Sequence, residues 1–373
     1  MRRFFFIGFG ILLIGNAVAQ GRVSIAADLL KGADSVVAAR VAVGLERLLG
    51  QKSSGKIDTA VIGGEDRAVS MSIFQDLDSA MLASAVRLVN LYATGGGRYR
   101  CDVSFVAADS GLLLGLIDFM VYPEDSNIRF GLPLAWLTKD WHKTELGTVR
   151  YHYTGAFDRR AAEEFDLRNR SIASRFGLRP LHLDIYLTRN FQEISTLIGR
   201  VYYYPWSGSI RSGLFPDTTA IFAIEGNEDF SHDIVHFYSS FFRGKVKRNA
   251  AADEGLAYLW GNAYYTDDRG RMISLDTLAV DLREYISAHR DVSMMDLFLT
   301  NPKVLAKRAK EVSVRAVISG VILAEVGRKK GDAGIKQVLL CGPGDDAFFG
   351  AAKVSLGIDK GNFDAEMRRL ITR

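Results

Sequence analysis

The chain has 373 residues, of which 48% are hydrophobic, and a formal net charge of +4. This length exceeds the usual range of a single domain, so we expect two domains. The mild charge argues against a nucleic-acid partner, and we interpret the basic run at residues 245–248 as a solvated loop. The two cysteines, Cys101 and Cys341, lack zinc-type spacing and leave a disulfide and free buried thiols as alternatives.

The N-terminus has the pattern of a signal peptide covering residues 1–19. Two arginines precede an apolar run at residues 4–14, and Ala17-Val18-Ala19 has the small-x-small form of a cleavage site. A membrane anchor is the alternative, but the run is shorter than the ~20 residues needed to span a bilayer. We therefore expect an exported protein, periplasmic or secreted, without stable membrane insertion after cleavage.

Residues 22–145 are predicted to form a small α+β domain with a helix-backed antiparallel sheet. Apolar periodicity predicts helices at residues 36–49 and 74–92. Segments 99–108 and 112–122 flank the turn signal Asp-Ser-Gly and are typical of a β-hairpin. No catalytic constellation occurs here, so support, substrate positioning and partner binding all remain possible roles.

Residues 146–373 are predicted to form a second domain with a β-rich first part and a helical tail. The expected elements are a helix at 159–176, a strand at 181–187, a short helix at 191–199, a β-rich stretch at 201–224, a helix from Ser231 as N-cap to just before Gly244, a helix ending near Gly261, a buried helix at 312–326 and a helical tail at 350–371. The last strand of the β-rich stretch is either an edge that pairs with an extended peptide or an internal strand.

The most informative motif is the run His232-Asp233-Ile234-Val235-His236, followed by Glu254 in the next predicted helix. Residues four apart share one helix face, so both imidazoles can converge on one metal ion. Glu254 could supply a third ligand and leave one coordination position open, as in catalytic zinc sites. The alternative is a pair of structural histidines without metal. The acidic residue after the first histidine and the nearby Glu-Gly-Leu-Ala segment favour the metal site.

Asp233 departs from the usual His-Glu-x-x-His motif, in which the glutamate is the general base. Aspartate is one methylene shorter, so its carboxylate falls short by roughly an ångström, which can cost on the order of a hundredfold in rate. Both residues are carboxylates of similar acidity, so proton acceptance by Asp233 is retained if the helix lies closer to the metal. Metal ligation is therefore better supported than catalysis.

This pattern resembles the gluzincin metallopeptidases, in particular the peptidase MA-like group. The similarity begins near Tyr151-His152-Tyr153, continues through the strand-like segments 183–187 and 218–223, and includes the tail at 350–371. The resemblance implies an α+β chain whose zincin-like domain, residues 146–373, follows the small N-terminal domain. It implies Zn²⁺ held by His232, His236 and Glu254, with Asp233 at the position of the catalytic base.

The implied activity is zinc-dependent hydrolysis of a peptide or protein substrate. The alternative is a peptidase-like envelope or binding module without catalysis, with zinc retained or lost. A donor for the transition state would also be needed, and residue type alone suggests Tyr264, Tyr265, Tyr285 and His289.

Overall fold

The structure, a computed structural model, describes residues 23–125, 127–206, 213–216, 219–264, 272–309 and 312–373. The predicted signal peptide at residues 1–19 lies outside them. The chain divides into two compact units, Met1–Lys139 with Ser195–Ser209, and Asp140–Ile194 with Ile210–Arg373. Both units combine helices with a sheet, so the predicted α+β class is confirmed. Among the described residues, no helix has the length and apolar character needed to cross a membrane.

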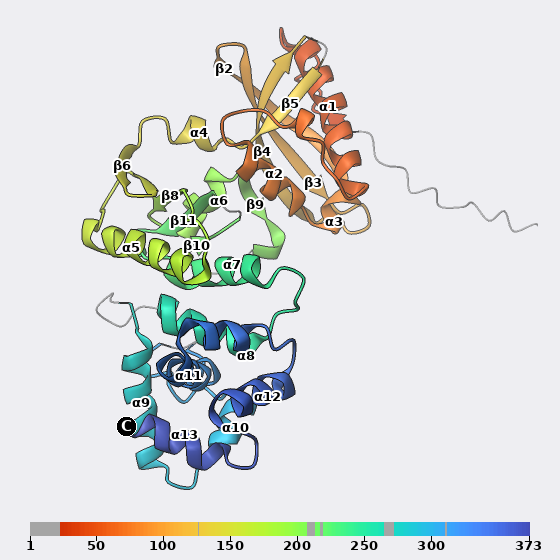
Figure 1. The fold of residues 1–373 in the computed structure, drawn as a ribbon. Coiled ribbons are helices and arrows are strands. Elements are labelled where there is room, and N and C mark those ends of the chain that lie inside the picture. The colour runs from red at the N-terminus through yellow and green to blue at the C-terminus, as the bar shows by residue number, and fades with distance from the viewer. Residues whose placement is uncertain (1–22, 126, 207–212, 217–218, 265–271, 310–311) are drawn as a thin grey trace, which may run out of the picture. The chain divides into compact units, whose positions relative to one another are not determined.

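The first unit contains a sheet backed by helices (Figure 1). Its strand order is β1-β2-β3-β4-β5, and β9 pairs with β4 beside β5. The predicted hairpin is confirmed, because β3 and β4 pair antiparallel from Tyr99 opposite Val121 to Val106 opposite Leu113. The strands are β1 (Ser24–Ile25), β2 (Ala85–Gly95), β3 (Arg98–Val106), β4 (Leu113–Glu124), β5 (Asn127–Gly131) and β9 (Arg200–Tyr203).

Helix α1 (Ser35–Ser53) supplies most of the helical layer of this unit and confirms the helix predicted at residues 36–49. Its buried face includes Val41, Leu45 and Leu48, spaced three or four residues apart as a core-facing helix requires. The remaining short helices of the unit are η1 (Thr59–Val61), α2 (Arg67–Gln75), α3 (Ser79–Leu82), α4 (Leu134–Leu137) and η2 (Tyr204–Trp206).

The helix predicted at residues 74–92 is wrong. Helix α2 ends at Gln75, and α3 begins after Asp78, whose side chain accepts a hydrogen bond from the Ala80 amide at 2.7 Å. Strand β2 follows, with Val86 and Leu88 buried and Ala85 and Arg87 exposed. This two-residue alternation is a strand pattern. It was predicted as helical because two short helices precede it in the same stretch of sequence.

The sheet of the second unit has the order β10-β11-β8-β7-β6. Its three central strands are parallel, and an antiparallel strand flanks them on each side. Because β10 pairs with β11, β11 is an internal strand rather than an edge for a peptide. The predicted β-rich stretch at 201–224 is divided, since β9 belongs to the other sheet. The strands are β6 (His142–Leu146), β7 (Val149–Tyr153), β8 (Leu183–Thr188), β10 (Gly213–Leu214) and β11 (Ala220–Ile224).

Helices α5 and α7 pack against each other on one face of this sheet, and α8 to α13 form a helical cluster around α11 (Figure 1). Strands, α5, α7 and the cluster share one apolar core. The predicted helices at 159–176, 191–199 and 312–326 and the helical tail are confirmed. The helices are α5 (Arg159–Phe176), α6 (Phe191–Leu197), α7 (Ser231–Arg243), α8 (Ala250–Leu256), the π-helical η3 (Ala257–Gly261), α9 (Leu275–Ala288), α10 (Met294–Thr300), α11 (Val314–Leu339), α12 (Asp345–Leu356) and α13 (Phe363–Ile371).

The cysteines are separate in the structure. Cys101 is buried, Cys341 is partly buried, and both are free thiols, so the free-thiol alternative holds.

Candidate metal centre

Helix α7 carries two of the predicted ligands on one side of the second unit's core. Ile234, Val235 and Tyr238 bury its apolar face, while His232 and His236 lie one helical turn apart beside them. The helix ends before Gly244, whose φ of +55° favours glycine. Local sequence therefore fixes the spacing of the two imidazoles.

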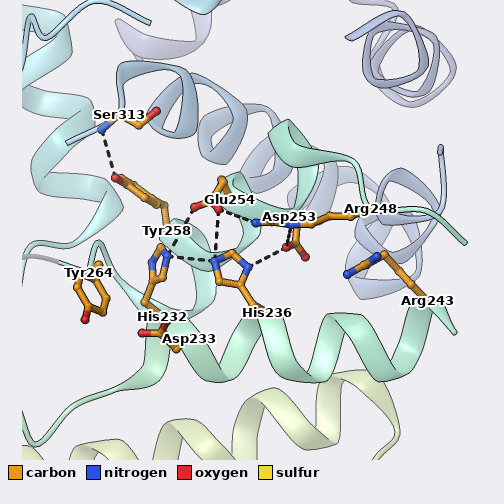
Figure 2. A pocket seen from close by; sticks show the side chains of 10 residues that line it. All are labelled: His232, Asp233, His236, Arg243, Arg248, Asp253, Glu254, Tyr258, Tyr264 and Ser313. Atoms are coloured by element: carbon orange, nitrogen blue, oxygen red, sulfur yellow. Dashed lines mark hydrogen bonds and ion pairs between the residues drawn. The ribbon is translucent and has the colours of Figure 1, made fainter. Parts of the chain in front are cut away.

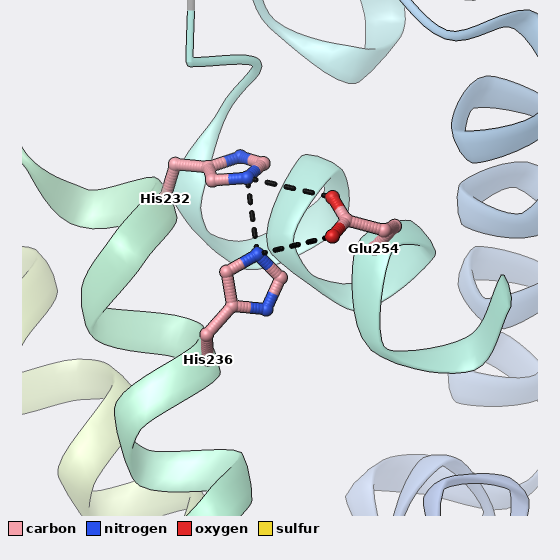
Figure 3. A group of neighbouring side chains, drawn as sticks. All are labelled: His232, His236 and Glu254. Carbon is pink, nitrogen blue, oxygen red and sulfur yellow. Dashed lines mark hydrogen bonds and ion pairs between the residues drawn. The ribbon is translucent and has the colours of Figure 1, made fainter. Parts of the chain in front are cut away.

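The third predicted ligand, Glu254 on α8, faces both imidazoles (Figure 3). His232 Nε2 and His236 Nε2 are 3.1 Å apart. His232 Nε2 lies 3.6 Å from Glu254 Oε2, and His236 Nε2 lies 3.5 Å from Glu254 Oε1. Three ligands placed 2.0–2.2 Å from a tetrahedral zinc ion are separated by roughly 3.3–3.6 Å from one another. The observed separations fit this donor set, so the cluster could hold a metal ion.

Hydrogen bonds at the other ring nitrogens orient both imidazoles. His232 Nδ1 donates to the Asn262 carbonyl at 3.0 Å, and His236 Nδ1 donates to Asp253 Oδ2 at 2.8 Å. In neutral histidine, a protonated Nδ1 leaves a lone pair on Nε2. The two lone pairs then face each other across 3.1 Å, an arrangement that a shared cation stabilises. Such outer hydrogen bonds are typical of metal-bound histidines.

Asp253 belongs to the candidate site, and the sequence pattern did not identify a role for it. It is 1% exposed and accepts hydrogen bonds from the Ser239 hydroxyl and from Arg248 Nε, the latter at 2.5 Å. Burial alone would raise its pKa, but the hydrogen bonds and the charges of His236 and Arg248 lower the pKa to about 2. Asp253 is therefore ionised and accepts a hydrogen bond from His236 Nδ1.

Arg248 also binds the candidate ligand Glu254, because its Nη2 lies 2.5 Å from Glu254 Oε1. Burial raises the pKa of Glu254, but His232, His236 and Arg248 together lower that pKa to about 2. Burial opposes the charged form of His232, yet Glu254 and Asp233 raise its pKa above the ordinary value. The Glu254 carboxylate, which faces the imidazoles, is thus ionised, and the Arg248 guanidinium partly neutralises its charge.

A close contact between the start of α7 and the end of η3 places the Asn262 carbonyl. A Cβ at Gly261 would lie 2.6 Å from the Ser231 carbonyl oxygen, so only glycine allows this approach. Asn262 has a φ of +82°, which directs its backbone out of η3. The Ser231 hydroxyl donates to the Gly261 carbonyl. Ser231 is the first residue of α7, and Phe230 occupies the N-cap position predicted for Ser231.

Arg168 on α5 connects the start of α7 with the end of η3. Its Nη1 lies 2.5 Å from Asp229 Oδ2, 3.3 Å from the Ser231 hydroxyl and 3.4 Å from the Gly261 carbonyl. Asp229 in turn accepts from the Ser231 amide at 3.1 Å. Arg168 therefore fixes the first turn of α7 and the segment that holds His232.

Asp233, the predicted base, lines the same cavity as the three candidate ligands. Its Oδ2 is buried and has no hydrogen-bond partner among the described residues. Burial raises the pKa of Asp233, while the nearby His232 and His236 oppose this rise. An unpaired carboxylate oxygen on a residue that lines this cavity could accept a proton from a bound molecule.

The cavity has a volume of about 620 Å³ (Figure 2). Of the four residues predicted as transition-state donors, Tyr264 lines the cavity. Tyr258 also lines it, but the sequence pattern did not identify this residue. Tyr285 and His289 stack on each other with ring centroids 4.3 Å apart and do not line the cavity, and Tyr265 lies outside the described residues. The lining residues are His232, Asp233, His236, Arg243, Arg248, Asp253, Glu254, Tyr258, Tyr264 and Ser313.

No protein-family model matches this chain, and no curated protein is significantly similar to it in sequence. The functional argument therefore rests on the site itself.

Proposed function

We propose that this protein is an exported, zinc-dependent peptidase of the gluzincin type, and that its second unit, rather than the whole of residues 146–373, is the zincin-like domain. The observation that carries the proposal is the convergence of His232, His236 and Glu254, with both outer imidazole nitrogens held by hydrogen bonds. Nitrogen and carboxylate donors of this kind suit Zn²⁺, and three protein ligands are typical of catalytic rather than structural zinc sites. Export is inferred from the signal-peptide pattern at residues 1–19.

In this proposal the side chains have distinct roles. A zinc ion held by the three ligands would act as a Lewis acid that polarises a peptide carbonyl and lowers the pKa of water. Asp233 accepts the proton of the attacking water and can return it to the leaving amine. Asp253 and the Asn262 carbonyl hold the imidazoles in the ligating tautomer. Tyr264, which lines the cavity, is the candidate donor to the developing oxyanion.

A non-catalytic metal-binding module is the second candidate, and two observations favour it. The base position holds Asp233, whose carboxylate reaches less far than that of glutamate. Arg248 also lies against Glu254, where its charge lowers the affinity of the site for a cation. The short Asp233 side chain and the contact of Arg248 with Glu254 would both reduce peptidase activity, and neither removes a candidate metal ligand.

Digestion of a peptide library by the mature protein separates the two candidates. The proposal predicts zinc-dependent cleavage by the wild type and no cleavage by Asp233→Asn at equal zinc content, because Asp233 is not a ligand. Zinc binding with no cleavage by the wild type would favour the binding module.

A further inference from the structure

Arg243 lines the cavity, and the proposed peptidase reaction gives its guanidinium no role. It lies seven residues after His236 and therefore on the same face of α7. Figure 2 shows its guanidinium beyond His236, on the side away from His232. With a helical rise of 1.5 Å per residue, the two Cα atoms are separated by roughly 10 Å along the helix.

The charge of Arg243 is not compensated by any described carboxylate. Its Nε is buried without a hydrogen-bond partner, and its Nη1 donates only to the Val246 carbonyl, at 3.3 Å, among the described residues. Arg248, the other arginine of the cavity, is instead bound by Asp253 and Glu254. A guanidinium that lines a cavity without an ion-pair partner can form charge-assisted hydrogen bonds with an incoming anion.

The surrounding charges favour the same ligand. The loop after α7 carries Lys245 and Lys247, both exposed, while the tyrosines and Asp233 line the cavity with the candidate metal ligands. For an approaching carboxylate, the charges of Lys245 and Lys247 offset part of the negative charge of Asp253 and Glu254, which line the cavity. The favourable interaction of a cation with a helix C-terminus explains an arginine at this position, but it does not explain a buried Nε without a hydrogen-bond partner.

We propose that Arg243 binds a carboxylate of the substrate, so that the cavity selects peptides with an acidic group near the reacting bond. This inference rests on the proposed peptidase function. An extended peptide spans about 3.3–3.6 Å per residue, so the ~10 Å between the Cα atoms of His236 and Arg243 corresponds to roughly three residues of a peptide that lies along α7. The group is either an acidic side chain or the C-terminal carboxylate of the peptide.

The test measures binding and cleavage separately. Binding uses the full mature chain with Asp233→Asn and zinc, and fluorescein-labelled, C-terminally amidated octapeptides in which one Glu is moved through each position of a neutral sequence. Matching Gln peptides and one neutral peptide with a free C-terminus complete the set. The added variants are Arg243→Gln, Arg243→Lys and Arg179→Gln, the last removing an exposed arginine that does not line the cavity. Cleavage of the same peptides is measured with the wild-type protein.

We expect one acidic peptide to bind about tenfold more tightly than its neutral counterpart, the effect of one charge-assisted hydrogen bond. Arg243→Gln should reduce this preference below about twofold, Arg243→Lys should keep part of it, and Arg179→Gln should keep all of it. Preference for the free C-terminus instead of the internal Glu would identify the terminal carboxylate as the bound group.

The inference is overturned if no acidic peptide is preferred, or if Arg243→Gln keeps the full preference. A preference that depends on Arg243, together with no cleavage of any peptide by the wild type, would refute the peptidase function and leave the carboxylate site in place.

Discussion

Asp253 and Glu254 are neighbours in sequence but act at different distances from the candidate metal. Glu254 faces both imidazole Nε2 atoms, whereas Asp253 reaches the far nitrogen of His236. The spacing of the two histidines predicted their convergence, because helical periodicity is a local property. The role of Asp253 was not predictable, since it depends on how α8 crosses α7.

Replacing Asp253 should weaken metal binding without removing a ligand. Asp253→Asn leaves an amide that holds the His236 ring less firmly, and the loss of such an outer hydrogen bond typically costs 10–100-fold in metal affinity. Chelator competition at fixed pH measures the zinc affinity. Asp296→Asn, an exposed acidic residue on α10, is the control and should leave the affinity unchanged. Equal affinities of wild type and Asp253→Asn would contradict the assigned role.

Replacing Asp233 by the longer glutamate distinguishes two cases: a site in which the aspartate falls short of the reacting water, and a site in which α7 lies closer to suit the aspartate. If Asp233 simply falls short, Asp233→Glu should raise the cleavage rate, by up to about a hundredfold for an ångström of misplacement. If α7 has moved to suit aspartate, the longer side chain should crowd the site and lower the rate. Rates on the peptide library at equal zinc content decide between them. The absence of cleavage by both proteins would favour the binding module.

At the scale of elements, glycines determine how closely the helices of the site approach. A Cβ at Gly255 would lie 2.6 Å from Ser319 Cβ and 2.8 Å from the Gly320 nitrogen, so α8 crosses α11 with the backbones nearly in contact. This crossing fixes the position of Glu254, the residue before Gly255. Helix bounds such as 159–176 were predictable from local periodicity and capping. The helix expected at 74–92 was wrong because two short helices and a strand share that window.

Adding a methyl group at this crossing should separate α8 from α11. We expect Gly255→Ala to reduce the free energy of unfolding by about 1–3 kcal/mol, the usual cost of overpacking, and to lower zinc affinity by moving Glu254. Gly350→Ala on α12 is the matched control, because a Cβ there meets nothing within 4 Å. The control should stabilise the protein by up to about 1 kcal/mol. Chemical denaturation and zinc titration of both variants measure these effects, and similar results for the two would contradict the role of Gly255.

At the scale of the whole molecule, the site lies entirely within the second unit. The chain length predicted two domains, but the sequence did not predict that Ser195–Ser209 joins the first unit, because the pairing of β9 with β4 connects distant parts of the sequence. A ligand stabilises the state that binds it, by about 2.7 kcal/mol at a concentration one hundred times its Kd. Metal binding should therefore stabilise the second unit selectively.

Hydrogen exchange with and without zinc measures this selectivity. We expect zinc to slow amide exchange in α7, α8 and η3, which carry the ligands and the glycine contact. Exchange in β2, β3 and β4 of the first unit should stay unchanged. Equal protection of both units, or of neither, would contradict a metal centre confined to α7 and α8.

The metal content of the purified mature protein tests the central claim most directly. After expression with added zinc, wild type should contain about one zinc per chain by elemental analysis, the stoichiometry of a single three-ligand site. His236→Ala should lose most of it, and His289→Ala, whose histidine lies outside the cavity, should keep it. Wild-type protein without zinc, or equal zinc in His236→Ala and wild type, would contradict a metal centre built from His232, His236 and Glu254.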